Sequence, residues 1–213
     1  MALDDDSEAP KGRKLGRPAD TDSTDTRERI VTCACNLFAS DGFEGTTNKD
    51  IADEAGISTA ALYHYFPSKS DLYVAVCDYI SGVFAELFQR AKDADKTLER
   101  RITVLLAENG KLGMTSPSIV GFTTRISAVV RKYPEVARGA DAFNASFRRL
   151  TLDLIETSTE KDAILAGGSV MGFADLTVSV LAGLGRMSAR GEQERRAAAG
   201  DMYIRLIRAA QHK

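Results

Sequence analysis

Residues 42–69 read G-F-E-G-T-T-N-K-D-I-A-D-E-A-G-I-S-T-A-A-L-Y-H-Y-F-P-S-K, and the helix-start and helix-stop signals in this stretch decide the fold. Thr47 followed three residues later by an aspartate is typical of a capped helix start, and Gly56 can adopt the left-handed conformation that ends a helix. Ser58 predicts the start of a second helix, which Pro67 ends. Two short helices joined by a tight glycine turn indicate a helix-turn-helix.

The second of these helices has one face that must pack inward and one face without charge. At 100° per residue, Leu62 and Phe66 project to the same side, which we expect to pack against the preceding helices. The opposite side carries small residues and flat hydrogen-bonding rings, which favours entry into the major groove of DNA. The alternative is a surface helix that merely happens to be uncharged. By this projection the candidate groove-facing residues are Ala60, Ala61, Tyr63 and His64, while Thr59 and Tyr65 flank the inward side.

Three side chains near these helices are suited to contact DNA phosphates. Lys69 lies in the first turn of the helix that follows Pro67, where a cation opposes the helix dipole and a nearby phosphate would reverse the sign of the effect. The hydroxyls of Tyr63 and Thr47 can donate to a phosphate, and the free N–H groups at the helix start beside Thr47 also attract anions. We therefore expect backbone contacts from Thr47, Tyr63 and Lys69.

A basic arm precedes the first predicted helix. Residues 1–23 have almost nothing to bury, so we expect them to be mobile in the free protein. Arg13, Lys14 and Arg17, together with Lys11, form a local cationic cluster that can reach phosphates or a narrow minor groove. The net charge of −2 does not exclude this role, because only a local cluster is needed. The alternative is a tail with no role.

The rest of the chain has helical periodicity. No segment shows sustained period-2 alternation, whereas 3.6-residue patterns recur from Ser68 to His212, so we predict an all-α protein with about nine helices. The first helix is expected from Thr26, and Gly42 should stop it. A further helix is expected over 162–189, and its interior glycines suggest close approach of another helix.

Composition argues against several other classes of protein. Charged residues make up 27% of the chain, and no apolar run approaches the eighteen or so residues of a membrane span, so we expect no membrane partner. The N-terminal residues lack the apolar stretch of a signal peptide, which predicts a cytoplasmic protein. The cysteines and histidines lack metal-site spacing, and neither a cofactor loop nor a nucleophile-base pair is evident, so we expect no metal, no cofactor and no enzyme activity.

Residues 26–78 resemble the tetracycline-repressor (TetR) family of bacterial regulators. The resemblance rests on the G-F-x-x-T-T segment, the D-I-A-x-x-A-G-I-S turn and the L-Y-H-Y-F-P-S-K-x-x-L-Y tail. It implies phosphate contacts from Thr47, Tyr63 and Lys69, and groove contacts from residues 59–65. One departure is that Thr59-Ala60 stands where many members have Lys-Gly, and the basic arm could compensate for that lost lysine.

The resemblance also implies the organisation of the whole chain. We expect a flexible arm (1–23), a three-helix helix-turn-helix DNA-binding domain (24–84, motif 47–66) and a helical ligand-binding and dimerisation domain (85–213). The homodimer would form through two C-terminal helices, at about 162–189 and 192–211. A ligand cavity in the body would relieve repression when it is occupied.

The ligand site is predicted from one polar residue in an apolar stripe. Arg125 lies one turn from both Phe122 and Val129, and a guanidinium there is costly to bury unless it is paired. The partner could be Asp175 or an anionic ligand, and the alternatives are an Arg125 that reaches solvent or one that is locked in a structural ion pair. The candidate cavity residues are Phe122, Arg125, Asn144, Phe147, Phe173 and Asp175.

These features predict a DNA-binding transcriptional regulator. The leading hypothesis is a repressor that a small, mostly apolar ligand releases from a palindromic operator of double-stranded DNA. The alternative within DNA binding is a regulator controlled by a protein partner, or an activator, with no small-molecule inducer. An apolar pocket with a few convergent polar groups would favour the first hypothesis.

Overall fold

The computed structural model describes the backbone of residues 19–211 and the side chains of residues 23–210. Within this range the protein has eleven α-helices, one 3-10 turn and no strand, which confirms the all-α prediction. The count exceeds nine because the short helices α2 and α9 were not predicted. The helices are α1 (Ala19–Ser40), α2 (Gly42–Gly45), α3 (Asn48–Glu54), α4 (Thr59–Tyr65), α5 (Lys69–Ala94), α6 (Leu98–Thr115), α7 (Pro117–Lys132), the 3-10 turn η1 (Pro134–Val136), α8 (Ala137–Glu156), α9 (Lys161–Leu165), α10 (Val170–Ala189) and α11 (Gln193–Gln211).

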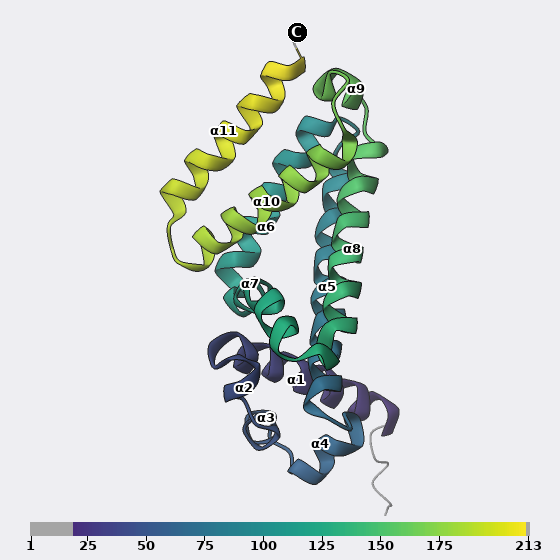
Figure 1. Ribbon diagram of the computed structural model, residues 1–213, viewed down its shortest axis with the longest axis vertical. Coiled ribbons are helices and arrows are strands. Elements are labelled where there is room, and N and C mark those ends of the chain that lie inside the picture. Colours follow the sequence, from purple (N-terminus) through teal and green to yellow (C-terminus); the bar gives the residue numbers. More distant parts are fainter. Residues whose placement is uncertain (1–18, 212–213) are drawn as a thin grey trace, which may run out of the picture.

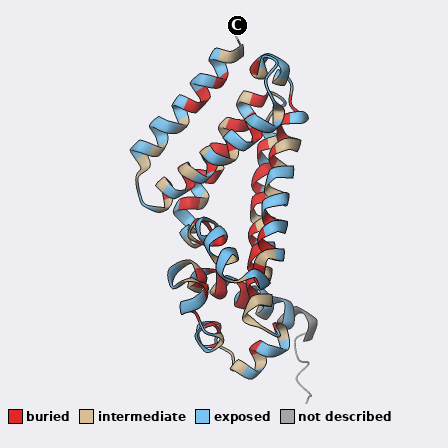
Figure 2. Cartoon of the chain, viewed as in Figure 1, coloured by how far each residue is buried: buried red, intermediate tan, exposed pale blue. Residues whose placement is uncertain are grey.

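The four N-terminal helices form one end of the molecule, and α5 runs from them into the helical body (Figure 1). In the body α5 lies alongside α8, and α10 lies alongside α6 (Figure 1). Helix α7 lies between the N-terminal helices and α10. Helix α11 lies at the outside, and much of its surface is exposed (Figure 2).

A cluster of aromatic rings joins the N-terminal helices to the body. The Tyr73 ring on α5 lies 5.4 Å from the ring of Phe38 on α1 and 5.3 Å from that of Phe43 on α2, measured between centroids. The Phe122 ring on α7 lies 4.7 Å from that of Tyr73. All four side chains are buried, so burial of apolar surface and favourable ring geometry together fix these four helices to one another.

Two helix boundaries differ from the sequence prediction. Helix α1 begins at Ala19, before the apolar periodicity that starts after Thr26, so residues 19–23 belong to a helix. The predicted helix over 162–189 is divided into α9 and α10. Gly167 has a φ of 81° and Ser169 caps α10 by accepting from the Gly172 amide, so this glycine serves a turn and not helix packing.

Helix α10 is the most apolar helix of the described chain. By length and composition alone it could cross a membrane, a property that core helices of soluble proteins share. Only 28% of its most apolar window is buried. Asp175 and Arg186 interrupt this helix, so it is not a continuous apolar run.

The start of α6 is fixed to the end of α8 by a buried arginine. The Arg101 side chain is 6% exposed. Its Nε donates to the carbonyl of Asp95 at 2.7 Å, and its Nη1 donates to the carbonyl of Leu154 at 3.1 Å and to the hydroxyl of Thr157 at 2.9 Å. These acceptors would lose their donor if the guanidinium were removed.

Replacing Arg101 with Leu should lower the free energy of unfolding by about 2–4 kcal/mol, because buried acceptors are left without a donor. Arg100→Leu is the matched control, since Arg100 is the exposed neighbour. Urea unfolding of both variants measures the difference. Equal loss of stability in the two variants would contradict the structural role of Arg101.

Candidate nucleic-acid interface and ligand cavity

The helix-turn-helix is fixed by the local hydrogen bonds that its sequence predicts. The Thr47 hydroxyl accepts from the Asp50 amide at 3.1 Å, while the Asp50 carboxylate accepts from the Thr47 amide at 2.8 Å, which completes a capping box for α3. Gly56 has a φ of 67°, as the turn requires. Ser58 caps α4 by accepting from the Ala61 amide at 3.1 Å. The predicted caps and the turn glycine are confirmed.

The capping box also occupies the hydroxyl proton of Thr47, which was expected from the sequence to bind a DNA phosphate. The Thr47 hydroxyl donates to Asp50 Oδ2 at 2.7 Å. These bonds from Thr47 lower the pKa of the Asp50 carboxyl, because they stabilise its charged form. In this structure, a phosphate at the start of α3 would meet the N–H groups of the helix end before it met a free Thr47 hydroxyl proton.

Helix α4 presents an uncharged face to solvent. Leu62 is 1% exposed and packs inward, together with Phe66, which follows the helix. Ala60, Tyr63 and His64 are exposed on the opposite side. The remaining candidates are half-buried, and the ring of Tyr65 packs against the core, which leaves it less available to a base than its neighbours. These half-buried candidates are Thr59, Ala61 and Tyr65.

A contact that the sequence did not predict orients Tyr63. Asn48, the first residue of α3, donates from Nδ2 to the Tyr63 hydroxyl on α4 at 3.0 Å. A hydroxyl that accepts this bond keeps its own proton for another acceptor, and on the outer face of α4 that acceptor would be a DNA phosphate. Asn48 lies at the start of one helix and Tyr63 on the next. Helical periodicity alone does not reveal that the two side chains meet.

Lys69 joins the start of α5 to the loop between α2 and α3. Its ammonium donates to the carbonyls of Phe43 at 2.7 Å and Thr46 at 2.9 Å, and it lies 4.5 Å from the centroid of the Phe43 ring. Partial burial lowers the pKa of Lys69. These carbonyls explain why a cation is tolerated in the first turn of a helix. Because an ammonium has three N–H groups, one remains for a phosphate.

The basic arm lies outside the described residues. This applies to Arg13, Lys14 and Arg17, whose role stays a prediction.

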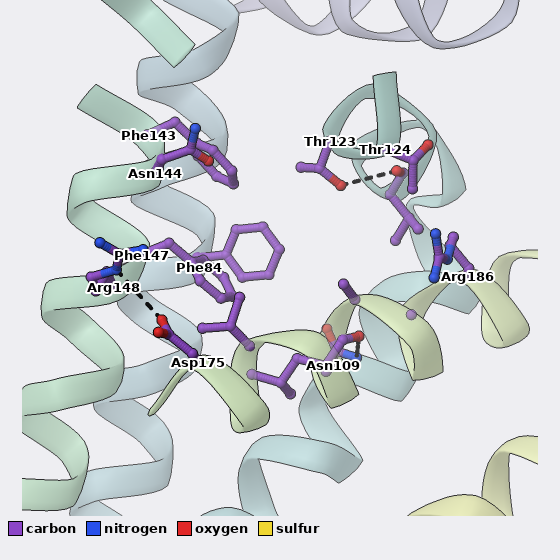
Figure 3. Close-up of a pocket in the computed structure, with 15 residues that line it drawn as sticks. Phe84, Asn109, Thr123, Thr124, Phe143, Asn144, Phe147, Arg148, Asp175 and Arg186 are labelled. Carbon is purple, nitrogen blue, oxygen red and sulfur yellow. Dashed lines mark hydrogen bonds and ion pairs between the residues drawn. The ribbon is translucent and has the colours of Figure 1, made fainter. Parts of the chain in front are cut away.

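The body contains a cavity of about 390 Å³ between α5, α6, α7, α8 and α10 (Figure 3). Three of the predicted ligand residues line it, namely Asn144, Phe147 and Asp175. The sequence did not single out the other polar or aromatic residues of its wall, because they come from five helices. These additional residues are Phe84, Asn109, Thr123, Thr124, Phe143, Arg148 and Arg186.

The other three predicted ligand residues lie elsewhere. Phe122 is 1% exposed and belongs to the aromatic cluster around Tyr73. Arg125 is exposed, and its Nη1 lies 3.5 Å from where a Cβ on Gly42 would be, so it faces the N-terminal helices.

Phe173 packs against Tyr203 of α11 with the ring centroids 6.4 Å apart. The predicted partner of Arg125, Asp175, instead lies 3.6 Å from Arg148 Nε.

Comparison with known proteins shows that the N-terminal helices are similar to a described family. Residues 30–76 match "Bacterial regulatory proteins, tetR family". Over 92 residues the chain is 36% identical to the HTH-type transcriptional repressor KstR2 of Rhodococcus jostii, a match that covers 40% of this chain and 45% of that protein. Over 57 residues it is 44% identical to the uncharacterized HTH-type transcriptional regulator YerO of Bacillus subtilis, covering 27% of this chain and 20% of that protein.

The similarity by sequence is partial, whereas the similarity of fold extends over most of the chain. The chain spans between a fifth and just under half of the length of the first curated relatives that it matches. A crystal structure of a TetR-family regulator from Rhodococcus sp. superposes with a TM-score of 0.69 at 17% identity, covering 86% of this chain and 99% of that one. At this identity the superposition shows a shared fold. The names of these proteins are those of regulators and not of enzymes.

Replacing Tyr63 with Phe or Asn48 with Leu should each weaken binding to duplex DNA by about fivefold, the equivalent of one hydrogen bond. When Tyr63 is already replaced by Phe, Asn48→Leu should cause little further loss of DNA affinity, because both changes remove the same phosphate contact. The salt dependence should stay unchanged, since no cation is removed. Fluorescence anisotropy over a salt series measures these quantities.

Additive losses in the double variant would contradict the positioning role of Asn48. Thermal unfolding of each variant is the control, because a purely structural effect would lower the melting temperature and leave no coupling in the affinities.

Proposed function

We propose that this chain is a DNA-binding regulator with a helix-turn-helix of the tetR type, a homodimeric repressor that a small, mostly apolar ligand releases from a palindromic operator. The observation that carries the ligand-released part is the cavity, which is walled by aromatic rings and a few polar groups, as ligand sites are. A regulator controlled only by a protein partner would need no such cavity.

In this proposal α4 enters the major groove and neighbouring groups hold the phosphates. Ala60 and His64 would meet base edges, since they lie on the exposed, uncharged face of α4. Tyr63 would donate to a phosphate, and Lys69 would add the third N–H of its ammonium. The cations of residues 11–17 would extend the contact along the duplex.

The dimer would form through α10 and α11, where the single chain leaves apolar surface uncovered. Leu176 on α10 is 51% exposed, and on α11 Met202 is 56% and Leu206 is 62% exposed. Gly183, two turns after Leu176, has no described atom within 4 Å of where its Cβ would be. An apolar helix face with a small residue allows a second copy to approach closely.

Helix α7 connects the cavity to the DNA-binding helices. Val120, Thr123 and Thr124 line the cavity. At the end of α7, Lys132 forms an ion pair with Glu44 of α2, and the ring of Tyr133 lies 4.9 Å from that of Phe43, centroid to centroid. A ligand that shifts α7 would therefore move the segment that holds α3 and α4, which supports release from DNA on ligand binding.

Selection from random duplex DNA should yield an inverted repeat, and native mass spectrometry should show two chains on it, because two-fold protein symmetry is mirrored in the operator. A library of small apolar molecules should contain compounds that release this operator. A non-repeated site bound by one chain would contradict the dimer. Val178→Phe fills the cavity. If such compounds still release the operator DNA from this variant, the cavity is not the ligand site.

Leu206→Glu should convert the dimer to a monomer at micromolar concentration, because it places a charge in the apolar α11 face. Met114→Glu, which changes a similarly exposed methionine on α6, should leave the dimer intact. Analytical ultracentrifugation compares the two variants. Dimers of equal strength in both would exclude α11 from the interface.

A further inference from the structure

The cavity has two chemically different sides. The rings of Phe84, Phe143 and Phe147 form one side, while Thr123, Thr124 and Arg186 lie across the cavity from them (Figure 3). The three rings pack against one another, with Phe84 and Phe147 4.8 Å apart at 86° and Phe143 and Phe147 5.9 Å apart. A fixed aromatic wall of this kind suits a flat or elongated apolar body.

The two arginines of the cavity differ in their partners. Arg148 is paired with Asp175 at 3.6 Å, so this end of the cavity carries balanced charge. Arg186 has no carboxylate within ion-pairing distance among the side chains of residues 23–210. Asp175 and Arg186 both line the cavity from α10, and they are separated by three helical turns, or about 16 Å along the axis. The cavity therefore has a neutral end and a cationic end.

Most of the hydrogen-bond donors near Arg186 already have an acceptor within the protein. The Thr123 hydroxyl donates to the Val120 carbonyl at 3.0 Å, and the Thr124 hydroxyl donates to the Gly121 carbonyl at 2.9 Å. The buried Asn109 amide donates one of its two N–H groups to the Leu181 carbonyl at 3.0 Å. A ligand acceptor on this side would therefore meet the guanidinium of Arg186 as its main donor.

We propose that the cavity binds an elongated, largely aromatic or polycyclic molecule with one anionic group, which Arg186 grips through its forked N–H groups while the apolar body lies against Phe84, Phe143 and Phe147. This inference rests on the proposed ligand-released function and names the chemistry of its ligand. It also replaces Arg125 with Arg186 as the anchor, because Arg125 faces the N-terminal helices. A carboxylate, sulfonate or phosphate would be held in the same way.

A matched pair of fluorescent probes tests the anionic anchor on the full-length protein. The probes are 8-anilinonaphthalene-1-sulfonate and N-phenyl-1-naphthylamine, which share the same aromatic body and differ by the sulfonate. Arg186→Gln should weaken binding of the sulfonate about tenfold, in the range of a charged hydrogen bond, and should leave the neutral probe within about twofold. Arg190→Gln is the control, because it removes the same charge one turn further along, outside the cavity.

Two cavity-filling variants show whether the probes occupy this cavity. Val178→Phe and Ala182→Phe each add a ring to the α10 wall of the cavity and should weaken the binding of both probes. Ala182 is the more exposed of the two residues, so its variant serves as the test if Val178→Phe unfolds the protein. Sulfonate binding that is unchanged in Arg186→Gln, or weakened equally in Arg190→Gln, would overturn the anchor while the ligand cavity stands. Probe binding that neither filling variant affects would overturn the ligand cavity itself.

Discussion

The packing of Tyr73 against Phe38, Phe43 and Phe122 is the interaction on which the rest of the structure depends. It brings four helices to one point, and two of them, α1 and α2, belong to the same end of the molecule as α4. Because interiors are close-packed, a displacement of one ring requires the others to move. The position of the N-terminal helices is thus tied to the body through a buried cluster and not through a flexible linker.

This cluster makes α7 a shared wall between the two halves of the molecule. One side of α7 contributes Val120, Thr123 and Thr124 to the cavity, while Phe122 enters the aromatic cluster. A ligand can shift an equilibrium only by the difference in its affinity for the two states, and typical couplings are about 1–3 kcal/mol. A change of that size is within the reach of one ion pair and a few ring contacts, such as Lys132 with Glu44 and Tyr133 with Phe43.

The sequence predicted the helix-turn-helix in detail because its determinants are local. The capping box of Thr47, the left-handed Gly56 and the cap of Ser58 each act within four residues, so their spacing alone specifies the geometry. The residues that line the cavity could not be predicted in the same way. Helical periodicity tells which side of α7 is apolar, but it does not tell that Phe122 packs on Tyr73 while Thr123, the next residue, faces the cavity.

Charged residues in unusual positions can also be recognised from the local sequence, whereas their partners are determined by the tertiary structure. Lys69 in the first turn of α5 predicts that some negative group lies nearby, and the structure supplies the carbonyls of Phe43 and Thr46. Arg125 in an apolar stripe also predicts a partner or a solvent path, and it is exposed beside Gly42. The sequence position of such a residue predicts that its charge is compensated or hydrated. The identity of the compensating group depends on which helices meet there, and that is set by contacts between residues far apart in the chain.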